Sequence, residues 1–301
     1  MPLADALSGW SWNPVVDIQR MWVFPFMVNA FRAGTLIAIG AAVTGWFMVL
    51  RRQSFAGHTL ATVGFPGAAG ATLLGVGAAY GYFVFCIAAA LVIAAVPRGG
   101  RDADGHEAAL VGTVQAFLLA CGFLFTALYK GLLGGITSLL FGSFLGVTTG
   151  QVGLLFAVTL ALLAVLAVIG RPLLFASVDP AVAAARGVPV RALSALFLVL
   201  LGAATAEASQ ITGTLLVFAL LVMPAATAQS LGARPVVSLA LSVLIALTVT
   251  WLGLVAAYFT PYPMGFTVTT FAFTGYLAAR AVPSVRRAVR PRRPVTTGGA
   301  A

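Results

Sequence analysis

Long apolar runs follow one another along almost the whole chain, and they constrain the fold more than any other feature of the sequence. Of the 301 residues, 61% are hydrophobic and only 8% are charged. Soluble domains carry about 25% charged residues, and about 20 apolar residues cross a bilayer as one helix. Because backbone polar groups inside a membrane must pair within their own segment, we expect an all-α, polytopic membrane helix bundle.

Nine candidate spans follow from the apolar runs, and a total of eight fits the pattern almost as well. The open question is 131–150, which is apolar but rich in glycine and is also typical of a short re-entrant segment. The nine ranges are 24–50, 58–77, 80–97, 108–128, 151–170, 193–209, 211–230, 236–259 and 265–282. We predict an extracytoplasmic or interfacial segment over 1–23, a transmembrane domain over 24–282 and a basic, disordered cytoplasmic tail over 283–301.

The basic residues are distributed unevenly among the loops. The net charge is +10 at pH 7, but no basic face interleaved with aromatic residues accompanies it, so we expect membrane lipid and no nucleic acid as a partner. With nine spans, every Lys and Arg except Arg20, Arg32 and Lys130 falls on one side of the membrane. The positive-inside rule names that side cytoplasmic, which predicts an outside N-terminus and a cytoplasmic C-terminus.

Glu207 is the only acidic residue embedded in an apolar run. A charged side chain facing lipid costs about 3 kcal/mol or more, so we expect Glu207 to face the bundle interior or a water-filled path. Two roles remain open. The carboxylate either attracts a cation in a permeation path or joins two helices by hydrogen bonds, with Ser209, Gln210 or Thr212 as possible partners.

His58 and Thr62 lie four residues apart in a hydroxyl- and glycine-rich segment. On a helix they share one face. An imidazole is a good ligand for a transition metal, whereas a hydroxyl is a weak ligand but a good hydrogen-bond partner. Both side chains either line a route for an ion or bond backbone carbonyls of their own region.

Four residues are expected to break or gate the spans: Pro66, Gly67, Gly213 and Pro224. Proline has no amide hydrogen and leaves the carbonyl four residues earlier unpaired, so Pro224 predicts a kink near Leu220. Glycine weakens a helix, and such positions are suited to a route that must open and close.

The segment Asp179–Arg191 predicts a short helix that is too short to cross a bilayer. Asp179 is a capping residue, Pro180 suits the first helical position, and Gly187 and Pro189 end the helix. Such a helix either docks on a soluble partner or simply connects two spans. The chain contains no Gly-x-x-x-x-Gly-Lys-Ser/Thr loop, so we expect it to have no ATPase site of its own.

Four stretches of the sequence form a recognisable set. They are Leu50–Gly57 followed by Phe65-Pro-Gly67, then Gly142–Val147, Asp179–Gly187 and Gly213–Ala228. In this order they resemble the membrane permeases of ABC importers for manganese, zinc and iron ions. The resemblance runs from about residue 25 to residue 282, and its last stretch is the most specific.

The resemblance implies a type II importer permease in a bacterial inner membrane, moving zinc or manganese inward by alternating access. It implies three partners: a cytoplasmic ATP-binding cassette subunit that holds the ATP, an extracytoplasmic metal-binding protein, and a second permease copy, identical or different. It implies no permanently bound cofactor and no enzymatic activity of the chain itself. Coupling to the ATPase would fall on Asp179, Ala183, Arg186 and Gly187.

The family commonly has an aspartate at the position of His58 and a histidine at that of Thr62. The candidate metal ligands here are therefore His58 and Glu207, which favours zinc over manganese because manganese prefers oxygen ligands. Three alternatives stay open. They are a permease for a metal chelate such as a siderophore or corrinoid, a stand-alone secondary transporter, and a membrane scaffold, although no clear internal repeat of the secondary-transporter kind is present.

Overall fold

The structure is a computed structural model in which 21–95, 103–129, 140, 142, 146–232 and 234–289 are described. Three parts of the chain lie outside these residues: most of the predicted N-terminal segment, most of the glycine-rich segment 131–150, and the part of the tail beyond Val289. Nothing described therefore tests whether 131–150 is a span or a re-entrant segment.

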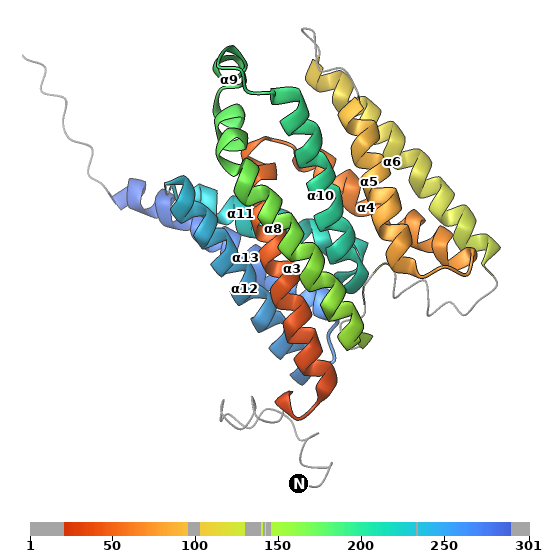
Figure 1. The fold of residues 1–301 in the computed structure, drawn as a ribbon. Helices are drawn as coiled ribbons and strands as arrows, with labels where there is room; N and C mark the ends of the chain where they lie inside the picture. The colour runs from red at the N-terminus through yellow and green to blue at the C-terminus, as the bar shows by residue number, and fades with distance from the viewer. Residues whose placement is uncertain are drawn as a thin grey trace, which may run out of the picture.

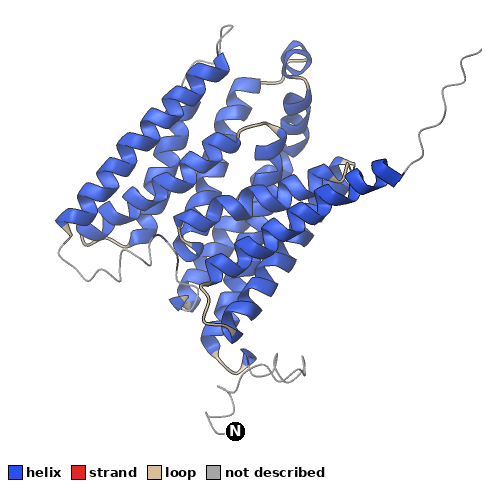
Figure 2. Ribbon diagram, turned by 180° about the vertical axis from the view of Figure 1, so that it is seen from behind, coloured by secondary structure: helices blue, strands red, loops and turns tan. Residues whose placement is uncertain are grey.

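Regular secondary structure in the described part of the chain is entirely helical (Figures 1 and 2), as predicted. Nine long helices coincide with the nine predicted ranges, although several ends shift by a few residues. The long helices are α3 (Pro25–Leu50), α4 (Ser54–Leu73), α5 (Ala78–Ala95), α6 (Ala103–Leu128), α8 (Thr149–Val178), α10 (Val190–Thr212), α11 (Thr214–Ser230), α12 (Pro235–Phe259) and α13 (Met264–Val289). The short helix α9 (Pro180–Ala185) joins α8 to α10.

Six of the described helices are long and apolar enough to cross a membrane. They are α3, α5, α8, α10, α12 and the Val111–Leu128 part of α6. Helix α11 is apolar but shorter than these. The chain is thus a multi-pass helical bundle, and the finer prediction of eight or nine crossings stays a prediction.

The helices form two groups (Figure 1). Helices α4, α5 and α6 pack against one another, while α3 packs against α8, α10, α11 and α12, and α13 covers α11 and α12. Helix α10 lies between the groups, because it contacts α3 and α8 as well as α4 and α5. Helices α3 and α10 are the most buried of the candidate spans, so the core of the bundle lies along them.

Within the first group, α4 and α5 are packed closely enough that their backbones touch. A Cβ atom at Gly67 of α4 would collide with the carbonyl oxygen of Gly81 in α5, and one at Gly81 would collide with the carbonyl oxygen of Gly67. Small residues allow this approach in membrane helices, where van der Waals packing is a main source of association. Gly67 therefore serves helix packing.

Helix α4 continues through Pro66 and Gly67, and α11 continues through Pro224, so none of the three ends its helix. The kink near Leu220 and the gating role of these residues stay predictions. An interior proline removes one helical hydrogen bond, and packed neighbours in a membrane protein commonly compensate for that loss. Gly213 does interrupt the helix, while its role as a gate stays a prediction. Gly213 has a φ of 73° and separates α10 from α11, and such a φ is readily adopted only by glycine.

Candidate functional site

The break at Gly213 is a compact backbone junction in the core. The Gly213 amide donates a hydrogen bond of 3.1 Å to the Ser209 carbonyl, which completes the last turn of α10. Gly142, with a φ of 79°, lies directly against the backbone of Ile211 and Thr212. Gly142 therefore contacts the break.

His58 lies in the second turn of α4 and is half-buried. Its ring packs edge-on against Phe218 of α11, with ring centroids 4.9 Å apart. The Nδ1 atom is buried and has no hydrogen-bond partner among the described residues. A buried polar atom without a partner is costly in a native structure, so the vacant nitrogen is available to a ligand that binds there.

Thr62 occupies the same side of α4, one turn further on, as the spacing predicts. Its hydroxyl donates a hydrogen bond of 2.9 Å to the Thr59 carbonyl. The predicted alternative that Thr62 bonds its own helix is therefore confirmed. Its oxygen lone pairs can still accept a hydrogen bond or contact a cation.

Glu207 lies in the interior of the bundle, with 1% of its surface exposed. Its carboxylate accepts a hydrogen bond from the Thr159 hydroxyl of α8. The other carboxylate oxygen is 3.6 Å from the place that a Cβ would take at Gly40 of α3. Glu207 therefore joins α10 to α8 beside a gap that Gly40 leaves in α3.

The partners suggested from sequence for Glu207 are not the ones it has. Gln210 bonds the Ala206 carbonyl, Thr212 bonds the Ala208 carbonyl, and the buried Ser209 hydroxyl has no described partner. Helix geometry turns Ser209 toward Gly64 of α4, away from the carboxylate. The residue that sequence reasoning missed is Thr159, and its signal is a lone hydroxyl in the apolar run 151–170.

The contacts described above for His58 and for Glu207 come from different helices. Those of Glu207 come from α3 and α8, whereas the ring of His58 contacts α11. In the described part of the chain, no three His, Cys, Asp or Glu side chains are grouped as a metal site would require.

The short helix α9 has the predicted caps. The Asp179 carboxylate accepts a hydrogen bond of 3.0 Å from the Val182 amide, and Pro180 occupies the first turn. Arg186 is the C-cap, and Gly187 follows with a φ of 80°. Only Ala183 of the helix is buried, so α9 presents nearly all of its surface outward at one end of the bundle (Figure 1).

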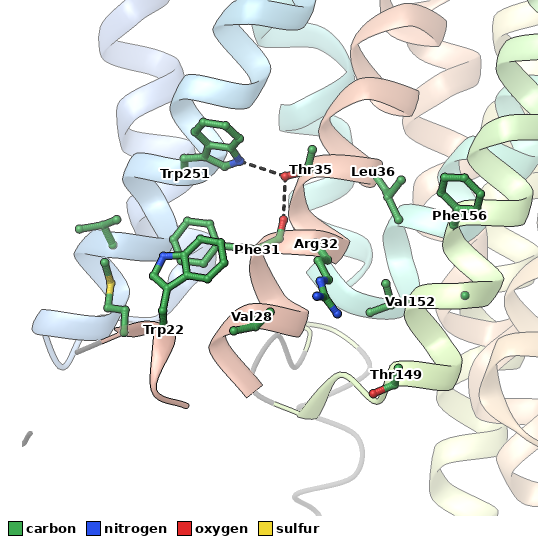
Figure 3. A pocket seen from close by; sticks show the side chains of 13 residues that line it. Trp22, Val28, Phe31, Arg32, Thr35, Leu36, Thr149, Val152, Phe156 and Trp251 are labelled. Carbon is green, nitrogen blue, oxygen red and sulfur yellow. Dashed lines mark hydrogen bonds between the residues drawn. The ribbon is translucent and has the colours of Figure 1, made fainter. Parts of the chain in front are cut away.

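An apolar groove of about 880 Å³ lies elsewhere, between α3, α8 and α12. Figure 3 shows Trp22, Phe31 and Phe156 around it, with Trp251 bonding the Thr35 hydroxyl at 3.0 Å. Among the described residues that line it, Arg32 alone is charged, and neither His58 nor Glu207 belongs to that lining. An almost wholly apolar wall is a poor path for a hydrated ion, so we do not assign the transport route to this groove.

A many-helix membrane bundle with buried polar side chains and an exposed capped helix at one end defines a membrane transport subunit. Residues 23–282 match the ABC 3 transport family. This match covers most of the sequence, and the chain belongs to the ABC 3 transport family.

Relatives with assigned roles resemble the chain over most of their length. The manganese transport system membrane protein MntC of Halalkalibacterium halodurans is 28% identical over 76% of this chain and 78% of its own length. The manganese import system permease protein ScaB of Streptococcus parasanguinis is 30% identical over 70% of this chain and 74% of its own length. The solved structure of PsaBC from Streptococcus pneumoniae in complex with Fab has a TM-score of 0.79 and 26% identity. That match covers 90% of this chain and 99% of the other.

Proposed function

We propose that the chain is the membrane permease subunit of an ATP-driven importer for a divalent metal ion. Membership of the ABC 3 transport family supports the transport role, and the manganese relatives support a metal cargo. The observation from the chain itself that carries the metal cargo is the vacant, buried Nδ1 of His58, because neutral imidazole is among the commonest metal ligands in proteins.

His58 and Thr62 are the residues that we propose for the ion route. They lie on one side of α4, and the ring of His58 packs against Phe218 of α11, the helix that begins at the break at Gly213. The nitrogen ligand supports zinc, whereas the relatives support manganese. The contacts of Glu207 support the second of its two predicted roles, a hydrogen-bonded link between α8 and α10, in place of a metal ligand.

The energy for transport would come from a separate cytoplasmic ATP-binding subunit that docks on α9. The exposed surface of α9 and its rigid caps support that docking. An extracytoplasmic binding protein would deliver the ion, and a second permease copy would complete the pathway. Alternating access then exposes the route to each side in turn, with the N-terminus outside and the C-terminus in the cytoplasm.

Uptake into proteoliposomes tests the proposal. The chain is purified with the ATP-binding subunit that accompanies it, reconstituted, and supplied with the extracytoplasmic binding protein and radioactive Mn²⁺ or Zn²⁺. We expect uptake of at least one free ion that requires ATP on the cytoplasmic side. Transport of a chelate but of neither free ion would point to the chelate permease instead, and uptake without ATP would point to a secondary transporter.

A further inference from the structure

Arg51 links α8 and α10, the two helices that α9 connects. It is the C-cap residue of α3. Its Nη1 donates a hydrogen bond of 3.1 Å to the Ser177 hydroxyl at the end of α8. Its Nη2 donates one of 2.5 Å to the Ser194 hydroxyl near the start of α10. These partners are 126 and 143 residues away in sequence.

The two serines lie on either side of α9 in the chain. Ser177 precedes the Asp179 cap by two residues, and Ser194 lies within the first five residues of α10. A displacement of α9 is therefore passed to both serines through short stretches of backbone. The Ser177 hydroxyl is itself anchored by a hydrogen bond to the Leu173 carbonyl at 2.5 Å.

The same guanidinium also contacts the start of α4. Its Nε donates a hydrogen bond of 3.3 Å to the side chain of Gln53, the N-cap residue of α4. The corner is stiffened by a bond from the Gln53 amide to the Met48 carbonyl at 3.0 Å, and the Met48 side chain packs on Gly57. His58 is the next residue after Gly57, so one side chain connects both ends of α9 to the candidate ion route.

The environment of Arg51 favours strong contacts. The side chain is half-buried, and its guanidinium carbon lies 5.4 Å from the centroid of the Phe197 ring. Hydrogen bonds from a charged donor are about twice as strong as neutral ones. The planar guanidinium offers five donors in a fixed geometry, which a lysine cannot reproduce.

We propose that Arg51 is a positioning residue that couples movement of α9 to α4 and so to His58. A partner that displaces α9 moves Ser177 and Ser194, and Arg51 carries that movement to the corner between α3 and α4. The contacts form one continuous physical path from the exposed helix to the route. This inference rests on the proposed function, because it requires an ATP-binding subunit that acts on α9.

Transport per ATP hydrolysed separates coupling from mere structural support. Both rates are measured in proteoliposomes that hold the purified complex, with Mn²⁺ and Zn²⁺ as substrates. For Arg51→Gln we expect ATP hydrolysis to continue while ions moved per ATP fall about fivefold or more, in line with the free energy of a charge-assisted hydrogen bond. Arg52→Gln is the matched control, since Arg52 is the exposed neighbour, and should keep the original ratio.

Three further variants test the contacts themselves. The double variant Ser177→Ala with Ser194→Ala leaves the arginine in place. We expect it to lower the number of ions moved per ATP as far as Arg51→Gln does. Combining all three changes should lower that number little further. Arg51→Lys keeps the positive charge but loses the planar guanidinium. We therefore expect its ratio of ions moved per ATP to stay as low as in Arg51→Gln. Three results would overturn the inference: full rescue of the ratio by lysine, an unchanged ratio in Arg51→Gln, or loss of complex assembly in every variant. Absence of ATP-driven uptake by the unmodified complex would instead overturn the proposed function.

Discussion

The polar side chains His58 and Glu207 were both candidate metal ligands, and the structure gives them different surroundings. Glu207 is fully enclosed and accepts a hydrogen bond from Thr159. His58 is half-buried and keeps a vacant buried nitrogen. A group that already has a partner stabilises the fold, whereas a vacant one is available for exchange with a moving ion.

His58 is expected to set which ion is carried. Replacement by aspartate supplies an oxygen ligand and should shift the preference of uptake from Zn²⁺ toward Mn²⁺. Replacement by phenylalanine keeps an aromatic ring against Phe218 but removes the ligand, and should lower uptake at low ion concentration about tenfold or more. Competition between the two radioactive ions in proteoliposomes measures both effects. Equal uptake by all three proteins would remove His58 from the route.

Glu207→Gln should leave ion uptake close to that of the unmodified chain, because a glutamine oxygen can still accept the hydrogen bond from Thr159. Thr159→Val removes the donor and should lower thermal stability, in line with a cost of about 1–3 kcal/mol for a buried polar group that loses its partner. Thr159→Ser is the control that retains the hydroxyl. Loss of uptake in a stable Glu207→Gln protein would restore the carboxylate to the ion route.

At the scale of elements, the apolar runs were enough to predict nine helical ranges, because each is bounded by charges, glycines or prolines. The position at which a helix is interrupted depends on more than local helix propensity. Pro66 and Pro224 are strong helix breakers in water, yet α4 and α11 continue through them, since tertiary packing overrides local preference. Gly213 breaks the helix through a φ of 73°, which glycine adopts readily because it has no Cβ.

Gly213→Ala should therefore destabilise the bundle by about 1–3 kcal/mol, the cost of placing a Cβ at a φ of 73° and a ψ of 157°, a conformation that is essentially restricted to glycine. Thermal unfolding of the purified protein in detergent measures the difference. Gly112→Ala is the control, because Gly112 lies within α6 with no neighbouring atoms near its Cβ position. That change should be neutral or slightly stabilising, since alanine favours helix. Equal stability of the two variants would mean that the break tolerates a side chain.

Asp179→Ala should weaken α9 by about 1 kcal/mol through loss of the N-cap. If α9 is the docking helix, ATP-driven uptake falls in this variant, while Asp179→Asn preserves capping and keeps most of the uptake. Both are measured at equal amounts of complex in proteoliposomes. A similar loss in both variants would show that the charge of Asp179 matters and that its capping does not.

At the scale of the whole molecule, long-range contacts were the part that sequence alone did not reveal. The ranges of α8, α9 and α10 were predictable, as was the capped nature of α9. That Arg51 joins Ser177 to Ser194 was not predictable, because the three residues lie in separate segments with no shared local pattern. The same is true of Thr159 and Glu207, 48 residues apart.

The orientation in the membrane can be tested with two exposed positions at opposite ends of the bundle. Val76 lies between α4 and α5, and Ala184 lies on α9. The basic loops place the first outside and the second in the cytoplasm. In intact cells, a membrane-impermeant thiol reagent should therefore label Val76→Cys, and it should label Ala184→Cys only after permeabilisation. The parent chain, whose Cys86 is buried and Cys121 half-buried, gives the background, and the reverse pattern would invert the topology.

The mutual contact of Gly67 and Gly81 also limits how the molecule can move. With the two backbones touching, α4 cannot swivel about its own axis without driving into α5. Any rearrangement around His58 must then carry α4 and α5 together as one rigid body. The corner between α3 and α4 then passes such a motion on as a firm joint, because the side chain of Arg51 and the backbone amide of Gln53 are both bonded there.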